Sequence, residues 1–268
     1  GAGAAGVMTP LTALDRGAAL ARELGVEAVG AEAADVARRL ADPRFFVACV
    51  GQFKRGKSSL LNALVGGAVL PVGVAPVTSV VTVLRAGDAP AASVRWRDGR
   101  VDAVPLASLA DYVDERRNPG NTKGVAAIEV RLPSPILQDG LCLVDTPGVG
   151  SVVAANTEAT RAFIPQVDAA LVVLGADPPV SDAELRMVVD LASQVGDFVF
   201  VLNKADRSSA ADLAEAAAFT ARVLEPTLGR PCPLLEVSAA ERLSGRGATR
   251  HEKNSVRPRP QFIRPRQS

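Results

Sequence analysis

Nine residues decide the fold of this chain: Gly51-Gln52-Phe53-Lys54-Arg55-Gly56-Lys57-Ser58-Ser59. They fit the pattern G-x-x-x-x-G-K-[ST], whose backbone N–H groups surround phosphate oxygens. An apolar run at 45–50 leads in as a buried strand, and a run at helical spacing, 60–65, leads out and stops at Gly66-Gly67. A strand, a tight loop and a helix N-terminus together favour bound phosphate. We therefore predict a nucleotide site.

Two side chains of this loop carry specific roles. Lys57 is expected to reach the β- and γ-phosphates, and the hydroxyl of Ser58 is expected to hold Mg²⁺. All nine residues are candidate contacts to the nucleotide. The alternative is a chance Gly/Lys/Ser loop, against which the flanking strand and helix argue.

The composition favours an α/β fold. Hydrophobic residues make up 48% of the 268 residues, and aromatic residues only 4%. Val- and Ala-rich runs are typical of strands that are buried on both faces, as in a parallel sheet covered by helices. We predict a mostly parallel, doubly wound sheet flanked by helices. Three scattered cysteines without metal-ligand spacing indicate reduced, buried thiols in a cytoplasmic protein.

Three regions are expected along the chain. Residues 1–42 form a lead-in and a helical segment, which Gly25 or Gly30 interrupts; its inward residues are predicted to be Leu14, Ala18, Leu24, Val29, Val36 and Leu40. Residues 43–240 form the nucleotide-binding domain. Residues 241–268 hold 8 Lys or Arg against 2 Asp or Glu, and are predicted to be a disordered basic tail that supplies no helix.

Within the central domain, the segment between the phosphate loop and Asp145 is long, because Gly51 and Asp145 lie 94 positions apart. A strand is predicted at 80–84. The alternating residues 93–101 around Asp98-Gly99 predict a hairpin, and 106–117 predict a helix.

Further polar residues follow predicted strands in the order that a guanine-nucleotide site requires. Asp145-Thr146-Pro147-Gly148 would hold a Mg²⁺-bound water through Asp145 and contact the γ-phosphate through the N–H of Gly148; an ordinary turn is the alternative. In Asn203-Lys204-Ala205-Asp206, Asn203 would brace the loop, Lys204 would cover the base, and Asp206 would accept hydrogen bonds from guanine. Ser238-Ala239 would offer a backbone N–H to guanine O6.

Catalysis is less well specified by the sequence. Thr78 would complete the Mg²⁺ shell and orient the attacking water. Val149 follows Gly148 and cannot orient a water, so stabilising charge must come from another residue. Lys54 and Arg55 are the candidates; the alternative is that this basic pair only raises the affinity for phosphate.

The set of motifs resembles the dynamin-like large GTPases, specifically their bacterial members. Residues 51–64 look like the phosphate loop of that group, 70–82 like its switch I, and 176–181 like a further family segment. The resemblance covers about residues 40–240 and implies a P-loop NTPase G domain with an inserted hairpin and an N-terminal helical segment. It further implies Mg²⁺-dependent GTP hydrolysis to GDP, G-domain dimerisation and action on membranes, with a monovalent cation as an additional cofactor to consider.

The chain departs from the family pattern after the last predicted strand, where a long helical bundle is expected and 28 basic, Pro-rich residues stand instead. The predicted location is the cytoplasm, with peripheral contact to the inner face of the membrane. A GTPase switch that associates with the ribosome or RNA through its basic tail is the alternative function, and a nucleotide-holding pseudo-enzyme is a third. The absence of a predicted RNA-binding domain disfavours nucleic acid as a partner.

Overall fold

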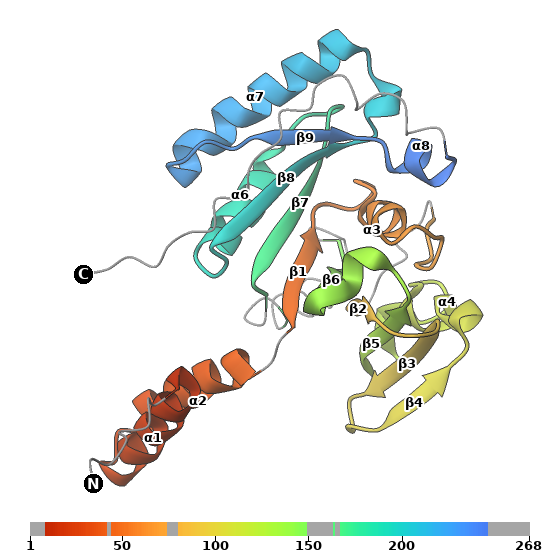
Figure 1. The fold of residues 1–268 in the computed structure, drawn as a ribbon. Coiled ribbons are helices and arrows are strands. Elements are labelled where there is room, and N and C mark those ends of the chain that lie inside the picture. Colours follow the sequence, from red (N-terminus) through yellow and green to blue (C-terminus); the bar gives the residue numbers. More distant parts are fainter. Residues whose placement is uncertain (1–8, 42–43, 74–79, 149–162, 164–166, 246–268) are drawn as a thin grey trace, which may run out of the picture.

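The computed structural model describes residues 9–41, 44–73, 80–148, 163 and 167–245. A nine-stranded sheet runs through the protein in the order β4-β3-β5-β2-β6-β1-β7-β8-β9 (Figure 1). The strands are β1 (Phe45–Val50), β2 (Thr82–Ala86), β3 (Ala91–Trp96), β4 (Val101–Val104), β5 (Val125–Leu132), β6 (Leu141–Asp145), β7 (Ala169–Gly175), β8 (Asp197–Asn203) and β9 (Leu234–Val237). The α-helices are α1 (Pro10–Glu23), α2 (Glu27–Ala41), α3 (Lys57–Val65), α4 (Ala110–Val113), α6 (Asp182–Ala192), α7 (Ala210–Leu228) and α8 (Ala239–Leu243). Short 3-10 turns are η1 (Leu106–Ser108), η2 (Pro119–Asn121), η3 (Pro135–Gly140) and η5 (Ala205–Arg207).

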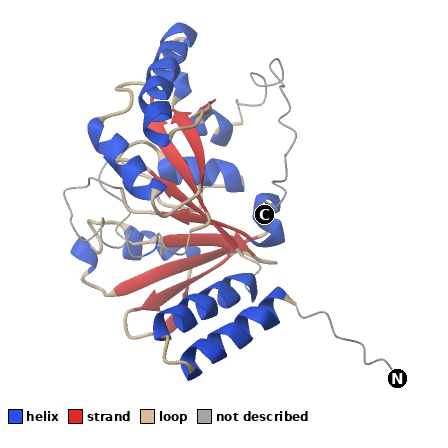
Figure 2. Ribbon diagram, turned by 90° about the vertical axis from the view of Figure 1, so that its left-hand side faces the viewer, coloured by secondary structure: helices blue, strands red, loops and turns tan. Residues whose placement is uncertain are grey.

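The half of the sheet that carries the phosphate loop is parallel. Strands β6, β1, β7, β8 and β9 pair in parallel in that order. Side chains alternate between the two faces, as the period of a strand requires. Cys49, Leu171 and Val201 pack with α3 on one face, whereas Val50, Val172 and Phe200 pack with α6 and α7 on the other. The predicted doubly wound α/β architecture is thereby confirmed (Figure 2).

The other half of the sheet is formed by β2, β3, β4 and β5, and residues 82–132, which contain these strands, are called the insertion below. Strand β2 pairs antiparallel with β6 and parallel with β5, and β3 pairs antiparallel with both β5 and β4. The predicted hairpin turns at Gly99, whose φ of +89° suits glycine. Because β3 hydrogen-bonds to β5, the insertion extends the central sheet and does not form a separate unit.

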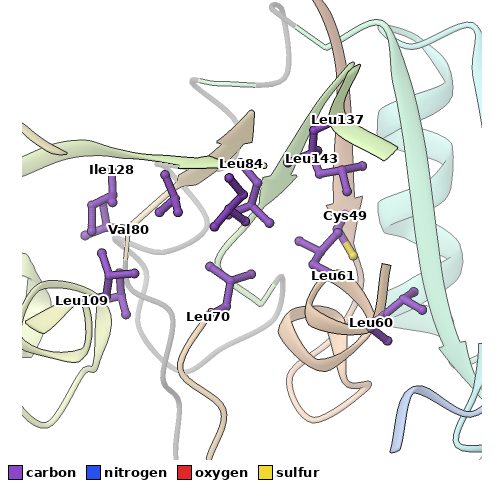
Figure 3. Close-up of a cluster of buried hydrophobic side chains, with 14 of the residues drawn as sticks. Cys49, Leu60, Leu61, Leu70, Val80, Leu84, Leu109, Ile128, Leu137 and Leu143 are labelled. Carbon is purple, nitrogen blue, oxygen red and sulfur yellow. The ribbon is translucent and has the colours of Figure 1, made fainter. Parts of the chain in front are cut away.

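One apolar core joins the two halves of the sheet. Figure 3 shows Leu61 of α3 beside Cys49 of β1. The same cluster continues through Leu84 of β2 to Ile128 of β5, and each of these four side chains is fully buried. The insertion therefore shares its core with the helix that begins at the phosphate loop, and this shared packing holds that helix in place.

Two predictions within the insertion need correction. The strand predicted at 80–84 is β2, Thr82–Ala86, two residues later. The helix predicted at 106–117 is only η1 and α4, because Asp114 adopts an extended backbone (φ −76°, ψ 122°). The Asp114 carboxylate accepts hydrogen bonds from the backbone and side chain of Arg116, and this local competition ends the helix.

The N-terminal helical segment is a pair of helices packed on each other. The break falls at Gly25 (φ +72°), whereas Gly30 lies inside α2. At Gly30 a Cβ would lie 3.3 Å from the carbonyl oxygen of Ala18, so the two helices approach closely there. Of the residues predicted to point inward, Ala18 is buried and Leu14 is half-buried. Three others are exposed, which corrects the prediction: Leu24, Val29 and Val36. The side chain of Leu40 lies outside the described residues.

The chain after β9 also differs from the prediction. A short helix, α8, begins at Ala239 and includes three residues that were predicted to be part of the disordered tail. Ser238 caps it, because its hydroxyl oxygen accepts a hydrogen bond from the N–H of Glu241 (3.1 Å). A single capped turn needs no apolar periodicity, which is why the pattern did not reveal it. Residues 246–268 lie outside the described part of the chain.

The prediction about the cysteines can also be compared with the structure. Cys49, Cys142 and Cys232 are all buried and form no disulfide, in agreement with the prediction. Among the described helices, none has both the length and the apolar character needed to cross a bilayer.

Candidate guanine-nucleotide site

The predicted site residues gather at one edge of the sheet. Strands β6, β1, β7, β8 and β9 are parallel neighbours, so their carboxyl ends meet there. The loop after β1 is the phosphate loop, and the predicted residues 145–148, 203–206 and 238–239 end or follow β6, β8 and β9. In open α/β sheets, ligands bind at this edge.

Glycine is required at both ends of the phosphate loop. A Cβ on Gly51 would lie 2.4 Å from the carbonyl oxygen of Val173, so only glycine lets the loop pass this close to β7. Gly56 has a φ of +88°, and a Cβ there would lie 2.5 Å from Asn203 Nδ2. The loop is therefore wedged between the ends of β7 and β8.

Lys57 lies at the start of α3 with its ammonium group inside the phosphate loop. Its Nζ donates hydrogen bonds to the carbonyl oxygens of Gly51 (3.0 Å) and Gln52 (3.3 Å). Burial lowers the pKa of Lys57, while the nearby Asp145 acts in the opposite direction. A buried cation in a loop of N–H groups is an arrangement that a phosphate anion would stabilise.

Ser58 and Asp145 form the candidate magnesium position. Ser58 Oγ donates a hydrogen bond to Asp145 Oδ2 over 2.6 Å, and Asp145 is 2% exposed. A hydroxyl and a carboxylate oxygen at this separation are the donor types that Mg²⁺ prefers, so the residues fit the ion. A Cβ on Gly148 would lie 3.1 Å from Phe53 N and 3.4 Å from Lys57 Nζ, which places Gly148 against the phosphate loop.

The loop after β8 is bound directly to the phosphate loop. Asn203 Nδ2 donates to the carbonyl oxygens of Arg55 (3.0 Å) and Gly56 (3.4 Å). Lys204 is left-handed (φ +67°), and its Nζ donates to the carbonyl oxygen of Lys54. Burial, foremost, and the charge of the nearby arginines lower the pKa of Lys204.

The loop after β9 is hydrogen-bonded to residues of the loop after β8. Ser238 Oγ donates to Asp206 Oδ1 over 2.6 Å, and the N–H of Ala239 donates to Asn203 Oδ1 over 3.3 Å. The carboxylate of Asp206 is thus oriented by a neighbour 32 residues further along the chain. The structure brings together all four predicted segments that it describes.

Of the predicted site residues, Arg55 contacts a different partner from the one expected, and Thr78 cannot be placed. The guanidinium of Arg55 is turned away from the phosphate loop and forms a buried ion pair with Glu184, which corrects its assignment as a source of charge at the phosphates. Thr78 lies outside the described residues. Lys54 keeps its candidacy: it is left-handed (φ +66°), and its Nζ lies 5.3 Å from the ring centroid of Phe53.

Glu184 is a site-adjacent residue that the sequence analysis missed. It is fully buried and forms a capping box with Ser181, whose N–H and hydroxyl donate to Glu184 Oε2. The pattern Ser-x-x-Glu is visible in the sequence and would have predicted the start of a helix. It would not have predicted the partnership with Arg55.

Comparison with known proteins decides the family. The model of the dynamin family matches residues 47–206, more than half of the chain, and spans the segments from β1 to Asp206. The chain belongs to the dynamin family. The dynamin-family match includes the phosphate loop, Asp145 and the loop after β8.

Individual relatives agree with this assignment. The chain is 35% identical over 206 residues to the "Uncharacterized protein in xynA 3'region" of Caldicellulosiruptor sp., covering 77% of this chain and 51% of the relative. It is 30% identical over 170 residues to the "Bacterial dynamin-like protein" of Nostoc punctiforme, covering 59% and 24%. A solved structure from work titled "An oligomerised bacterial dynamin pair provides a mechanism for the long range sensing and tethering of membranes" aligns with a TM-score of 0.64 at 20% identity, covering 89% and 46%.

The chain therefore spans about half the length, or less, of these relatives. The aligned part corresponds mainly to the GTPase domain of the family. The structural alignment supports the fold.

Proposed function

We propose that this dynamin-family chain binds GTP together with Mg²⁺ and hydrolyses it to GDP and phosphate. The observation that carries the proposal is the bracing of two loops by Asn203, which binds the backbone of the phosphate loop and stands three residues before Asp206. A phosphate site and a base-reading carboxylate are thereby held in one rigid unit. This arrangement supports the binding of a nucleoside triphosphate.

Selectivity for guanine rests on the Asp206 carboxylate. It would accept hydrogen bonds from the N1–H and the 2-amino group of guanine, while Ser238 keeps the carboxylate oriented through Oδ1. Adenine has neither donor, so its binding would forgo both of these hydrogen bonds to the carboxylate. The stem of Lys204 would cover one face of the base, and the loop at 238–239 would offer a backbone N–H to guanine O6.

For hydrolysis, Ser58 and Asp145 are the residues that would hold the magnesium ion. Mg²⁺ supplies neutralisation of the charge on the β- and γ-phosphates. Lys57 binds the same phosphates, Thr78 orients the attacking water through its backbone, and Gly148 contacts the γ-phosphate. Lys54 supplies positive charge beside the transferred group. Since Val149 cannot orient a water, Thr78 takes the water-positioning role.

The description of a solved relative supports a proposal for the wider role. A solved relative is described as an oligomerised pair that senses and tethers membranes over long range. We propose that this domain likewise associates through its G domain and acts at a membrane surface, from the cytoplasmic side, as part of a membrane-remodelling GTPase.

The proposal is tested with the purified chain by calorimetric titration and by phosphate release. GTP and GDP should bind in the presence of Mg²⁺, ATP should bind far more weakly, and phosphate release should stop when Mg²⁺ is chelated. Equal affinity for GTP and ATP would contradict the guanine assignment. Binding of GTP without any phosphate release, with or without anionic vesicles, would support the pseudo-enzyme. A shift of RNA mobility in place of vesicle binding would support the ribosome- or RNA-associated alternative.

A further inference from the structure

Arg55 makes an unusually complete set of contacts away from the phosphates. Its Nε and Nη2 donate to Glu184 Oε1 (2.7 Å) and Oε2 (2.8 Å), so the two groups meet as a fork. Its Nη1 and Nη2 also donate to the carbonyl oxygens of Pro178 (3.0 Å) and Pro179 (3.5 Å). Four of the five N–H donors of the guanidinium are thereby used. The side chain cannot turn to a nucleotide without abandoning a buried carboxylate.

Glu184, the partner of Arg55, is itself held in place by hydrogen bonds. The side chain of Glu184 is 0% exposed, and the N-terminal turn of α6 holds it through the backbone and hydroxyl of Ser181. The path of β7 leaves room for the guanidinium only because residue 175 is glycine: a Cβ there would lie 2.2 Å from Arg55 Nη1. The side chain of Arg55 is therefore surrounded by three segments: the end of β7, residues 178–179 and the start of α6.

The backbone of the same residue belongs to the nucleotide site. The carbonyl oxygen of Arg55 accepts the hydrogen bond from Asn203 Nδ2 (3.0 Å), and Gly56 and Lys57 follow it directly. Arg55 thus connects α6 through its side chain with the loop after β8 through its carbonyl group. A shift of its side chain would move the N–H groups that we expect to contact phosphate.

We propose that Arg55 and Glu184 are positioning residues, which hold the phosphate loop in its nucleotide-binding shape by tying it to α6. This inference rests on the proposed function and deepens it. The Arg55–Glu184 ion pair acts on the binding of the nucleotide. Its effect is the same whether or not the nucleotide carries a γ-phosphate. Arg55 variants should therefore weaken GDP and GTP binding alike and raise KM, while kcat at saturating GTP changes little. A source of charge for the transition state would show the opposite pattern.

The experiment measures GDP affinity, KM and kcat for GTP, and melting temperature in the full chain. Arg55→Met should weaken GDP binding about tenfold or more. Arg55→Lys should weaken it nearly as much, because an ammonium keeps the charge but cannot form the fork. The matched control is Arg85→Met, which breaks the Arg85–Glu129 ion pair (2.7 Å) between β2 and β5 and should leave GDP affinity unchanged.

A double variant separates positioning from stability. Arg55→Met with Glu184→Leu removes both buried charges and is expected to recover the melting temperature of the unmutated chain, because apolar pairs often replace buried ion pairs without loss. GDP affinity should stay low, since the tie is still absent. Recovery of both quantities would overturn the proposal, because the single-variant defect would then come only from an unpaired charge.

Two other outcomes would also overturn it. One is full GDP affinity in Arg55→Met, and the other is a loss of kcat without any change in GDP affinity. Failure of the unmutated chain to bind GDP would instead refute the proposed function, so the two failures are distinguishable.

Discussion

The substitution Asn203→Ala tests whether the hydrogen bonds of Asn203 to the neighbouring loops affect the affinity for the nucleotide. Asn203 is 2% exposed, and its amide makes three hydrogen bonds: to the carbonyl oxygens of Arg55 (3.0 Å) and Gly56 (3.4 Å), and from the N–H of Ala239 (3.3 Å). At about 1 kcal/mol per bond, Asn203→Ala should lower the free energy of unfolding by about 2–3 kcal/mol. That is a substantial part of a typical ~5–15 kcal/mol. The melting temperature should fall by about 5–10 °C.

A second buried asparagine supplies the control. Asn62 is 1% exposed and also makes three bonds, donating to the carbonyl oxygen of Leu70 (2.8 Å) and accepting from the N–H groups of Val69 (3.0 Å) and Leu70 (2.7 Å). Asn62→Ala should therefore cost a similar free energy, measured by urea denaturation without nucleotide.

Only the nucleotide titration should distinguish the two variants. We expect Asn203→Ala to bind GTP at least about tenfold more weakly than Asn62→Ala, because only the former loosens the loops at the sheet edge. If the two variants lose equal stability and retain equal affinity for GTP, the bracing is purely structural. Asn203 would then play no part in shaping the nucleotide site.

Four further outcomes are expected from the sequence and the structure. Lys57→Ala should abolish GTP binding in calorimetry, because the phosphates lose their buried counter-charge; retained binding would refute the role of Lys57. Asp206→Asn should shift preference from guanine to xanthine nucleotides in a competition assay, and an unchanged preference would count against base reading by this carboxylate. The hydrogen bond from Arg116 lowers the pKa of Asp114. Asp114→Asn should therefore destabilise the chain above the ordinary carboxyl pKa of about 3.9, and this deficit should shrink as the pH falls through the lowered pKa. A deficit that does not vary with pH in urea denaturation would contradict that cause. Deletion of residues 246–268 should leave the melting temperature and GTP affinity unchanged, and a sharp fall in either would show that the tail packs against the body.

The sequence by itself determined the elements whose cause is local. The phosphate loop is nine consecutive residues between an apolar strand and a helix, so its place between these two elements is set by neighbours in the chain. The central strands are continuous apolar runs, and their period and composition predict a parallel sheet without reference to distant residues. The hairpin at Asp98-Gly99 is local in the same sense. All three were predicted correctly.

Errors arose where a local pattern competes with one specific side-chain contact. The segment 106–117 has helical periodicity, yet Asp114 binds Arg116 and ends the helix early. The turn of α8 shows the reverse, since the hydrogen bond from the N–H of Glu241 to Ser238 Oγ caps a helix that the apolar pattern does not predict. Such contacts change the free energy by about 1 kcal/mol, which is comparable with the difference between helix and coil for a few residues.

Only the tertiary structure decided which distant residues meet. Arg55 and Glu184 are 129 positions apart, and nothing near Arg55 in the sequence distinguishes a phosphate ligand from a buried ion-pair partner. The antiparallel pairing of β2 with β6, which extends the sheet through the insertion, is likewise invisible in either strand alone. The physical reason is common to both. Periodicity and propensity act over a few residues along the chain, whereas a contact across the sheet depends on the register of several strands at once, and that register exists only after the core has packed.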